Sequence, residues 1–110
     1  MSAVKADIKT DKKIIIVEDN ENIGKVIAKT LTQEGYITKV IPYGNAAIFY
    51  AIENPNSILL MESTLPDMSA KEIINSLRDN KIDIPFIIMS PPGNEKTVIE
   101  MMKLGVKDYL

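Results

Sequence analysis

The sequence contains neither cysteine nor histidine. Without cysteine, a disulfide framework and a thiolate metal site are both excluded. Without histidine, the usual general base at neutral pH, the His-based catalytic triads and the commonest zinc ligand are excluded as well. Any metal centre in this chain must therefore use hard oxygen ligands, a donor set that favours Mg²⁺.

Long apolar runs and clustered basic residues are also missing. The apolar runs are too short to cross a bilayer, and the N-terminus lacks the apolar segment of a signal peptide. The net charge is −2, and no basic run is denser than Lys12-Lys13. Because phosphate contacts need clustered Lys and Arg, nucleic-acid binding by this domain alone is disfavoured. We expect a cytoplasmic protein that does not enter a membrane.

What is present is the composition of one soluble domain. The chain has 110 residues, of which 45% are hydrophobic and 25% charged. That length supports a single core but not two. Residues 1–12 are polar and show no periodicity, so we interpret them as a flexible N-terminal lead-in. The domain then occupies residues 13–110.

Strands and helices are predicted to alternate along this domain. Apolar or β-branched runs predict strands, and apolar residues at helical spacing predict helices. Gly35 stands where a left-handed residue ends the first helix, and Ser69 with Glu72 forms a capping box at the start of the third. The predicted strands are 13–17, 37–41, 58–61, 84–89 and 106–110, and the predicted helices are 23–34, 46–53, one beginning near 70, and 95–104.

This alternation predicts an α/β fold with a doubly wound, parallel, five-stranded sheet. The flavodoxin-like strand order 2-1-3-4-5 is one of two common arrangements. The polar second strand, with Thr38 and Lys39, suits the edge of such a sheet. The last helix of the fold is missing from the sequence, so we expect the domain to be incomplete at its C-terminus. A chain longer by about 15 residues should then be more stable.

Four polar residues follow predicted strands at one edge of this sheet. Glu18 and Asp19 follow the first strand, Glu62 follows the third, and Ser90 follows the fourth. In the assumed order the chain direction reverses between strands one and three, which is where ligands bind. A single carboxylate after a strand more often caps a helix or meets water. Three converging carboxylates repel one another, and a bound cation would relieve that repulsion.

These residues resemble the receiver domain of two-component response regulators. The acidic pair Glu18-Asp19 is similar to that family's metal-binding pair, and Ser90 to its switch hydroxyl. Tyr109 stands at its switch aromatic position. The resemblance covers nearly the whole domain without gaps, and two further segments carry it: Leu65-Pro66-Asp67-Met68 and Gly105-Val106-Lys107-Asp108-Tyr109-Leu110.

In that family an aspartate accepts a phosphoryl group from a partner histidine kinase. The resemblance implies that Mg²⁺ is held by Glu18, Asp19, the residue at position 62 and the backbone carbonyl of Thr64. Here Glu62 stands at the phosphoacceptor position, so Mg²⁺ binding is expected to be weak or absent. Ser69-Ala70 replaces a frequent Asp-Gly pair, and Pro91 replaces a small flexible residue. The family's lysine falls beyond Leu110.

The first hypothesis is therefore an atypical receiver module, not an enzyme, that acts by protein–protein contact without the normal phosphorylation cycle. Its partner would be a histidine kinase or a downstream signalling protein. A homodimer through the fourth helix and fifth strand is a further form of this contact. The alternative is a conventional receiver in which Glu62 is an engineered, phosphomimetic replacement of aspartate. A weaker alternative is a flavodoxin-like module for a nucleotide or flavin, although no glycine-rich loop follows Val17.

Overall fold

Five parallel strands form one sheet in the order β2-β1-β3-β4-β5, which confirms the predicted order. The computed structural model describes residues 13–89 and 108–109. The predicted lead-in over 1–12, the predicted helix over 95–104 and Ser90 lie outside this part. The strands are β1 Lys13–Val17, β2 Ile37–Ile41, β3 Ser57–Glu62, β4 Phe86–Met89 and β5 Asp108–Tyr109, and the helices are α2 Glu21–Gln33, α3 Gly44–Glu53 and α4 Ala70–Asp79.

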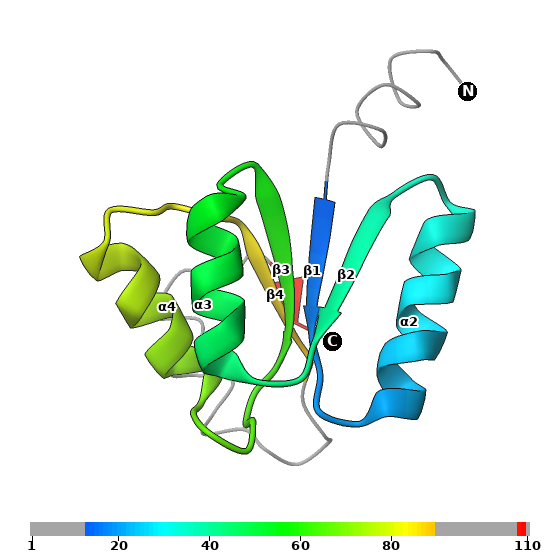
Figure 1. Cartoon of the computed structure of the whole chain (residues 1–110), viewed down its shortest axis with the longest axis horizontal. Helices are drawn as coiled ribbons and strands as arrows, with labels where there is room; N and C mark the ends of the chain where they lie inside the picture. The colour runs from blue at the N-terminus through cyan, green and yellow to red at the C-terminus, as the bar shows by residue number, and fades with distance from the viewer. Residues whose placement is uncertain (1–12, 90–107, 110) are drawn as a thin grey trace.

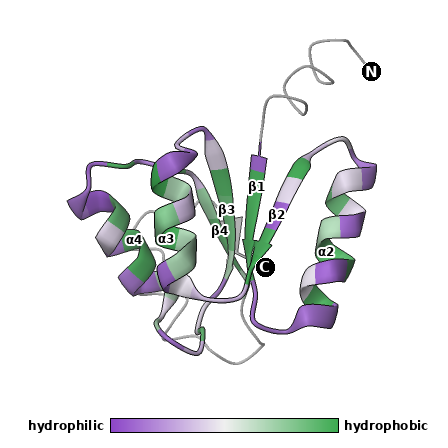
Figure 2. Ribbon diagram, in the orientation of Figure 1, coloured by the Kyte–Doolittle hydropathy of each residue, from purple (hydrophilic) through white to green (hydrophobic). Residues whose placement is uncertain are grey.

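Helices cover both faces of the sheet. In Figure 1, α2 lies on one side of the strands, and α3 and α4 lie together on the other. Along β1, Ile15 and Val17 join the core beneath α3 and α4, whereas Ile14 and Ile16 join the core beneath α2. Since both faces are buried, β1 is apolar without alternation, and Figure 2 shows the central strands as largely hydrophobic.

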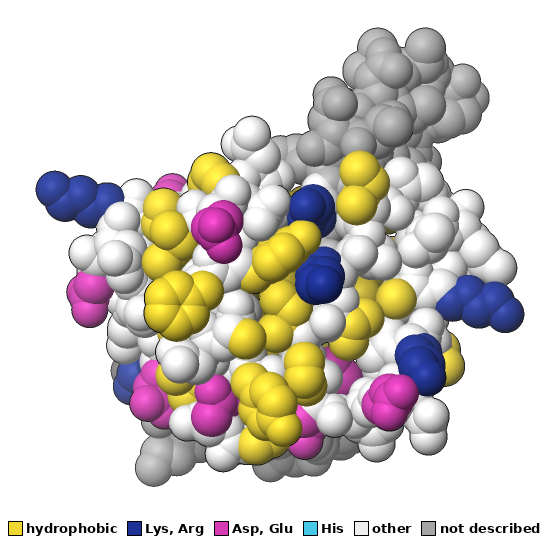
Figure 3. All heavy atoms as spheres, in the orientation of Figure 1, with side chains coloured by type: hydrophobic (Ala, Val, Ile, Leu, Met, Phe, Trp, Pro, Cys, Tyr) yellow, Lys and Arg dark blue, Asp and Glu magenta, His cyan; other side chains and the backbone are white. Residues whose placement is uncertain are grey.

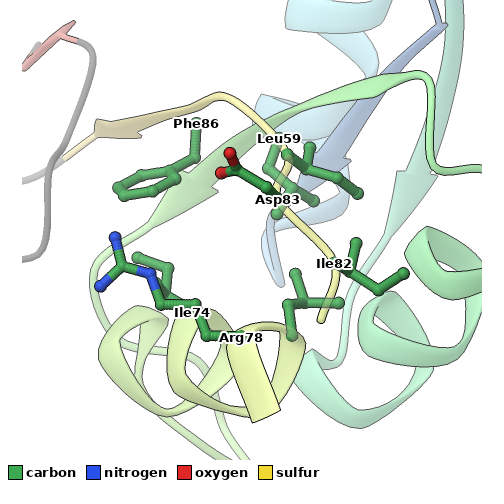
Figure 4. A pocket seen from close by; sticks show the side chains of 8 residues that line it. Leu59, Ile74, Arg78, Ile82, Asp83 and Phe86 are labelled. Carbon is green, nitrogen blue, oxygen red and sulfur yellow. The ribbon is translucent and has the colours of Figure 1, made fainter. Parts of the chain in front are cut away.

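The packing beneath α4 follows the predicted pattern. Ser69 accepts a hydrogen bond from the Glu72 amide, and the Glu72 side chain accepts one from the Ser69 amide, so the predicted capping box is present. Ile74 of α4 lies over the sheet near Leu59 and Phe86, around a cavity of about 10 Å³ (Figure 4). That volume admits about one water molecule. The α4 interface is therefore closely packed.

Helix α2 is less buried than its apolar spacing predicts. Asn20 caps it by accepting a hydrogen bond from the Ile23 amide. Ile27 and Leu31 pack against the sheet, but Ile23 and Val26 leave 46% and 65% of their surfaces exposed. The spacing predicted the helix correctly, but only part of its apolar face packs against the sheet.

The polar strand β2 lies at the edge of the sheet, as predicted. Ile37 at its start is half exposed, and the Lys39 ammonium lies 5.8 Å from the centre of the Tyr50 ring of α3. In the space-filling view of this side, hydrophobic side chains form several groups with charged and polar side chains between them (Figure 3). No described helix is both long enough and apolar enough to span a membrane.

Several element boundaries differ from the predicted ones. Helix α3 begins at Gly44 instead of residue 46, because a cap from a distant loop orders its first turn, as described below. Strand β3 extends by one residue at each end, to Ser57 and Glu62. Strand β4 begins at Phe86 instead of residue 84, because Pro85 has no amide hydrogen to donate to a neighbouring strand.

Two helices end in the same backbone motif with different residues at the left-handed position. After α2, Gly35 has φ 98° and Tyr36 donates its amide to the Leu31 carbonyl. After α4, Lys81 has φ 60° and Ile82 donates its amide to the Leu77 carbonyl. This is the Schellman arrangement, in which glycine is favoured because a Cβ is strained at positive φ. Gly35 meets that requirement and Lys81 does not.

We predict that Lys81→Gly stabilises the protein by about 0.5–1 kcal/mol, since the strain relieved exceeds the entropy that glycine adds to the unfolded chain. The measurement is the midpoint of urea denaturation. Lys81→Ala is the matched control: it removes the same charged side chain but keeps the Cβ, and it should leave the midpoint unchanged. An alanine variant as stable as the glycine variant would contradict the backbone explanation.

Candidate functional site

The register of the two central strands brings three carboxylates together. Val17 pairs with Met61, so the residues that follow them, Glu18 and Glu62, stand side by side at the carboxyl edge of the sheet. Asp19 lies next to them, and one oxygen from each of the three carboxylates lies within 4.8 Å of the others. Glu18 is buried, Glu62 is half-buried and Asp19 is exposed. The cluster thus extends from the protein interior to its surface.

This crowding favours the protonated form of Glu62. Burial, together with hydrogen bonding and repulsion from the neighbouring carboxylates of Glu18 and Asp19, raises the pKa of Glu62 to about 8. The Oε2 atom of Glu62 is buried and has no hydrogen-bond partner among the described residues. A buried acceptor oxygen without a partner destabilises the folded protein. A bound proton or cation would remove this penalty.

Backbone contacts hold Glu18 in position. Its amide donates to the Ile41 carbonyl of β2 at 3.2 Å, and its Oε2 accepts from the Asn20 amide at 3.1 Å. Asn20 in turn caps α2, so the turn after β1 serves both the helix and the carboxylate. One Glu18 oxygen therefore has a fixed donor, and the charge is held where β1 ends.

The loop after Glu62 is closed on itself. Thr64 and Ser69 form an isolated antiparallel bridge, and the Leu65 amide donates to the Met68 carbonyl at 2.9 Å. At the base of the loop, Ser63 donates its amide to the Met89 carbonyl and accepts the Ala70 amide. Hydrogen bonds on both sides of the loop thus fix the backbone of Thr64, which follows Glu62 by two residues in the sequence.

Asp67 has a role in this loop that the sequence pattern did not predict. Its two carboxylate oxygens accept the amides of Gly44 and Asn45, at 2.8 and 2.9 Å, across 23 and 22 residues of sequence. These bonds lower the pKa of Asp67. The structure shows why this helix needs such a contact: Tyr43, at the N-cap of α3, forms no side-chain capping hydrogen bond. A helix without a local capping residue needs one from elsewhere.

Two further predicted site residues cannot be placed beside the carboxylates. Ser90 lies outside the described residues. Tyr109 belongs to β5, where Tyr109 pairs with Ile88 of β4, but only its backbone is described. Of the predicted site residues, the structure brings together Glu18, Asp19 and Glu62.

Known proteins share both the sequence pattern and this fold. The family described as "Response regulator receiver domain" matches residues 14–110. The transcriptional regulatory protein FixJ of Rhizobium meliloti (strain 1021) is 34% identical over 101 residues, covering 92% of this chain and 50% of FixJ. The transcriptional regulatory protein CusR of Escherichia coli (strain K12) is 26% identical over 98 residues, covering 89% of this chain and 43% of CusR. The chain thus spans half or less of these relatives.

Solved structures of receiver domains have the same fold as this chain. The crystal structure titled FixJ-N superposes with a TM-score of 0.83 at 33% identity, covering 89% of this chain and 78% of that one. The receiver domain of the Francisella response regulator 1452 gives 0.81 at 26% identity, covering 89% and 81%. These matches do not favour the flavodoxin-like nucleotide-binding or flavin-binding alternative. The chain belongs to the response regulator receiver domain family.

Proposed function

We propose that this receiver domain binds Mg²⁺ weakly at Glu18, Asp19 and Glu62 and signals by protein–protein contact, independently of the phosphorylation cycle. The observation that carries the proposal is the convergence of the three carboxylates at the ends of β1 and β3. In the family pattern the residue at the end of β3 accepts the phosphoryl group, and here that residue is Glu62. Receiver domains are signalling modules, which fits a role in protein–protein contact instead of enzymatic turnover.

The donor set fits a hard divalent cation. Three carboxylates within 4.8 Å supply negative charge, and the unpartnered Oε2 of Glu62 supplies an oxygen that the protein leaves free among the described residues. The Thr64 carbonyl would be a fourth donor, as the family resemblance implies. When bound, Mg²⁺ would neutralise charge at the end of the sheet and on any phosphoryl oxygen placed there.

The side chain of Glu62 explains the proposed independence from phosphorylation. Its carboxylate stands about 1.5 Å further from the backbone than that of an aspartate, one C–C bond. A misplacement of about 1 Å can cost roughly 100-fold in a positioned reaction. With Mg²⁺ bound, Glu62 would be ionised and would place a carboxylate near the position of a phosphoryl group. That charge would either bias the domain toward an active-like state or leave it without a phosphorylation switch.

The partner proposed for this module is a histidine kinase or a downstream signalling protein. FixJ and CusR are named transcriptional regulatory proteins, and each is at least twice as long as the segment matched here. We propose that the contact surface, including that of any homodimer, involves strand β5 and the helix predicted over 95–104. The latter lies outside the described residues.

We predict that incubation with acetyl phosphate and Mg²⁺ adds no stable phosphoryl group to this protein, as measured by intact mass. Glu62→Asp is the matched variant, because it shortens the side chain by one methylene and keeps the charge. It should accept phosphate on the order of 100-fold faster. A stable acyl phosphate mapped to Glu62 would overturn the proposed independence from phosphorylation.

We also predict that, without metal, stability falls as the pH rises. The pKa of Glu62 is about 8 in the folded protein, against 4.5 as its ordinary value. Between these pH values the unfolded chain releases a proton that the folded protein retains, so the unfolding free energy declines from about pH 4.5 to about pH 8. Glu62→Gln should flatten this decline, and millimolar Mg²⁺ should oppose it in the wild type. Urea denaturation at several pH values measures all three.

If the unfolding free energy of Glu62→Gln declines with pH as much as that of the wild type, other titrating groups cause the decline. The same series contains an internal check at lower pH. The lowered pKa of Asp67 has the opposite sign, so its contribution is present above its ordinary value and is lost only as the solution becomes more acidic. The two windows therefore do not overlap.

A further inference from the structure

The cap on α3 comes from the loop that follows the candidate site. Asp67 accepts the first two amides of α3, where the helix dipole favours a negative charge. The neighbouring Met68 packs over Gly44 so closely that a Cβ there would collide with the Met68 side chain. The start of α3 and the tip of the loop therefore meet at two adjacent points, one polar and one apolar.

The same loop carries Thr64 on its other side. The Thr64–Ser69 bridge and the hydrogen bond from the Leu65 amide to the Met68 carbonyl join the two sides. A displacement of Asp67 and Met68 would pass through these bonds to the backbone of Thr64. Helix α3 is itself anchored in the main core through Ala47, Ile48 and Ala51, so it is a firm support for the loop.

We propose that Asp67 is a positioning residue for the metal centre: by capping α3 it holds the loop that directly follows Glu62, and with it the backbone of Thr64. Asp67 acts through the loop and does not itself contact the cation. The part of this inference that concerns the metal rests on the proposed function. The mechanical part, the coupling of the α3 cap to the loop, stands on the hydrogen bonds alone.

The experiment compares Mg²⁺ affinity in three variants by isothermal titration calorimetry, at a temperature where circular dichroism shows all of them folded. Residues that orient metal ligands typically contribute 10–100-fold to affinity. Asp67→Ala should therefore weaken Mg²⁺ binding about 10-fold, and Asp67→Asn, which keeps one acceptor oxygen, should lie between it and the wild type. Ile48→Val is the control, since it removes one methyl group from the buried face of α3 and leaves the Asp67 cap and the loop hydrogen bonds intact, and it should bind Mg²⁺ as the wild type does.

Amide hydrogen exchange separates the two parts of the inference. In Asp67→Ala, the amides of Gly44, Asn45 and Leu65 should lose protection together, whereas Ile48→Val should leave Leu65 protected. If the wild type binds no Mg²⁺, the proposed metal centre fails, and the Leu65 amide alone decides the coupling. Unchanged Leu65 protection in Asp67→Ala overturns the coupling. Wild-type Mg²⁺ affinity in Asp67→Ala, or an equal loss in Ile48→Val, overturns the positioning role.

Discussion

The pairing of β1 with β3 is the constraint on which the rest of the molecule depends. Val17 lies opposite Met61, so the residues that follow the two strands lie side by side at the carboxyl edge of the sheet. Those residues are Glu18 and Glu62, two carboxyl groups that repel each other when both are ionised. A shift of one residue in this register would turn the buried side chains of one strand to the opposite face. The hydrophobic core therefore fixes the crowding of the carboxylates, and they cannot relieve it by moving apart.

The surroundings of the carboxylates confine the effect of this repulsion mainly to Glu62. Glu18 has a fixed donor in the Asn20 amide, and Asp19 faces solvent, so Glu62 bears most of the cost. Buried like charges are common where a protein is built to receive a cation or a proton. In the receiver domain family, phosphoryl transfer takes place at such a cluster of carboxylates. In this chain the same place holds a longer side chain, and the functional proposal follows from that single difference.

The sequence was sufficient for those features that depend on local pattern. The apolar runs of β1 and β3 predicted a parallel sheet buried on both faces, and Ser69 with Glu72 predicted the start of α4. The features it did not predict depend on contacts between distant segments. Asp67 caps a helix that begins 23 residues earlier, and no local pattern contains that pairing. The exposure of Val26 depends on how α2 lies over the sheet, which helical spacing alone does not determine.

The edge strand β2 has a consequence for self-association. Parallel sheets with an open edge present unpaired backbone donors and acceptors, which can recruit a strand from another molecule. Lys39 stands in the middle of β2, with its ammonium near the Tyr50 ring. A strand added at this edge would have to desolvate that charge, whereas the half-exposed Ile37 alone would favour the addition. A lysine at this position therefore disfavours the pairing of a second strand with the edge of the sheet.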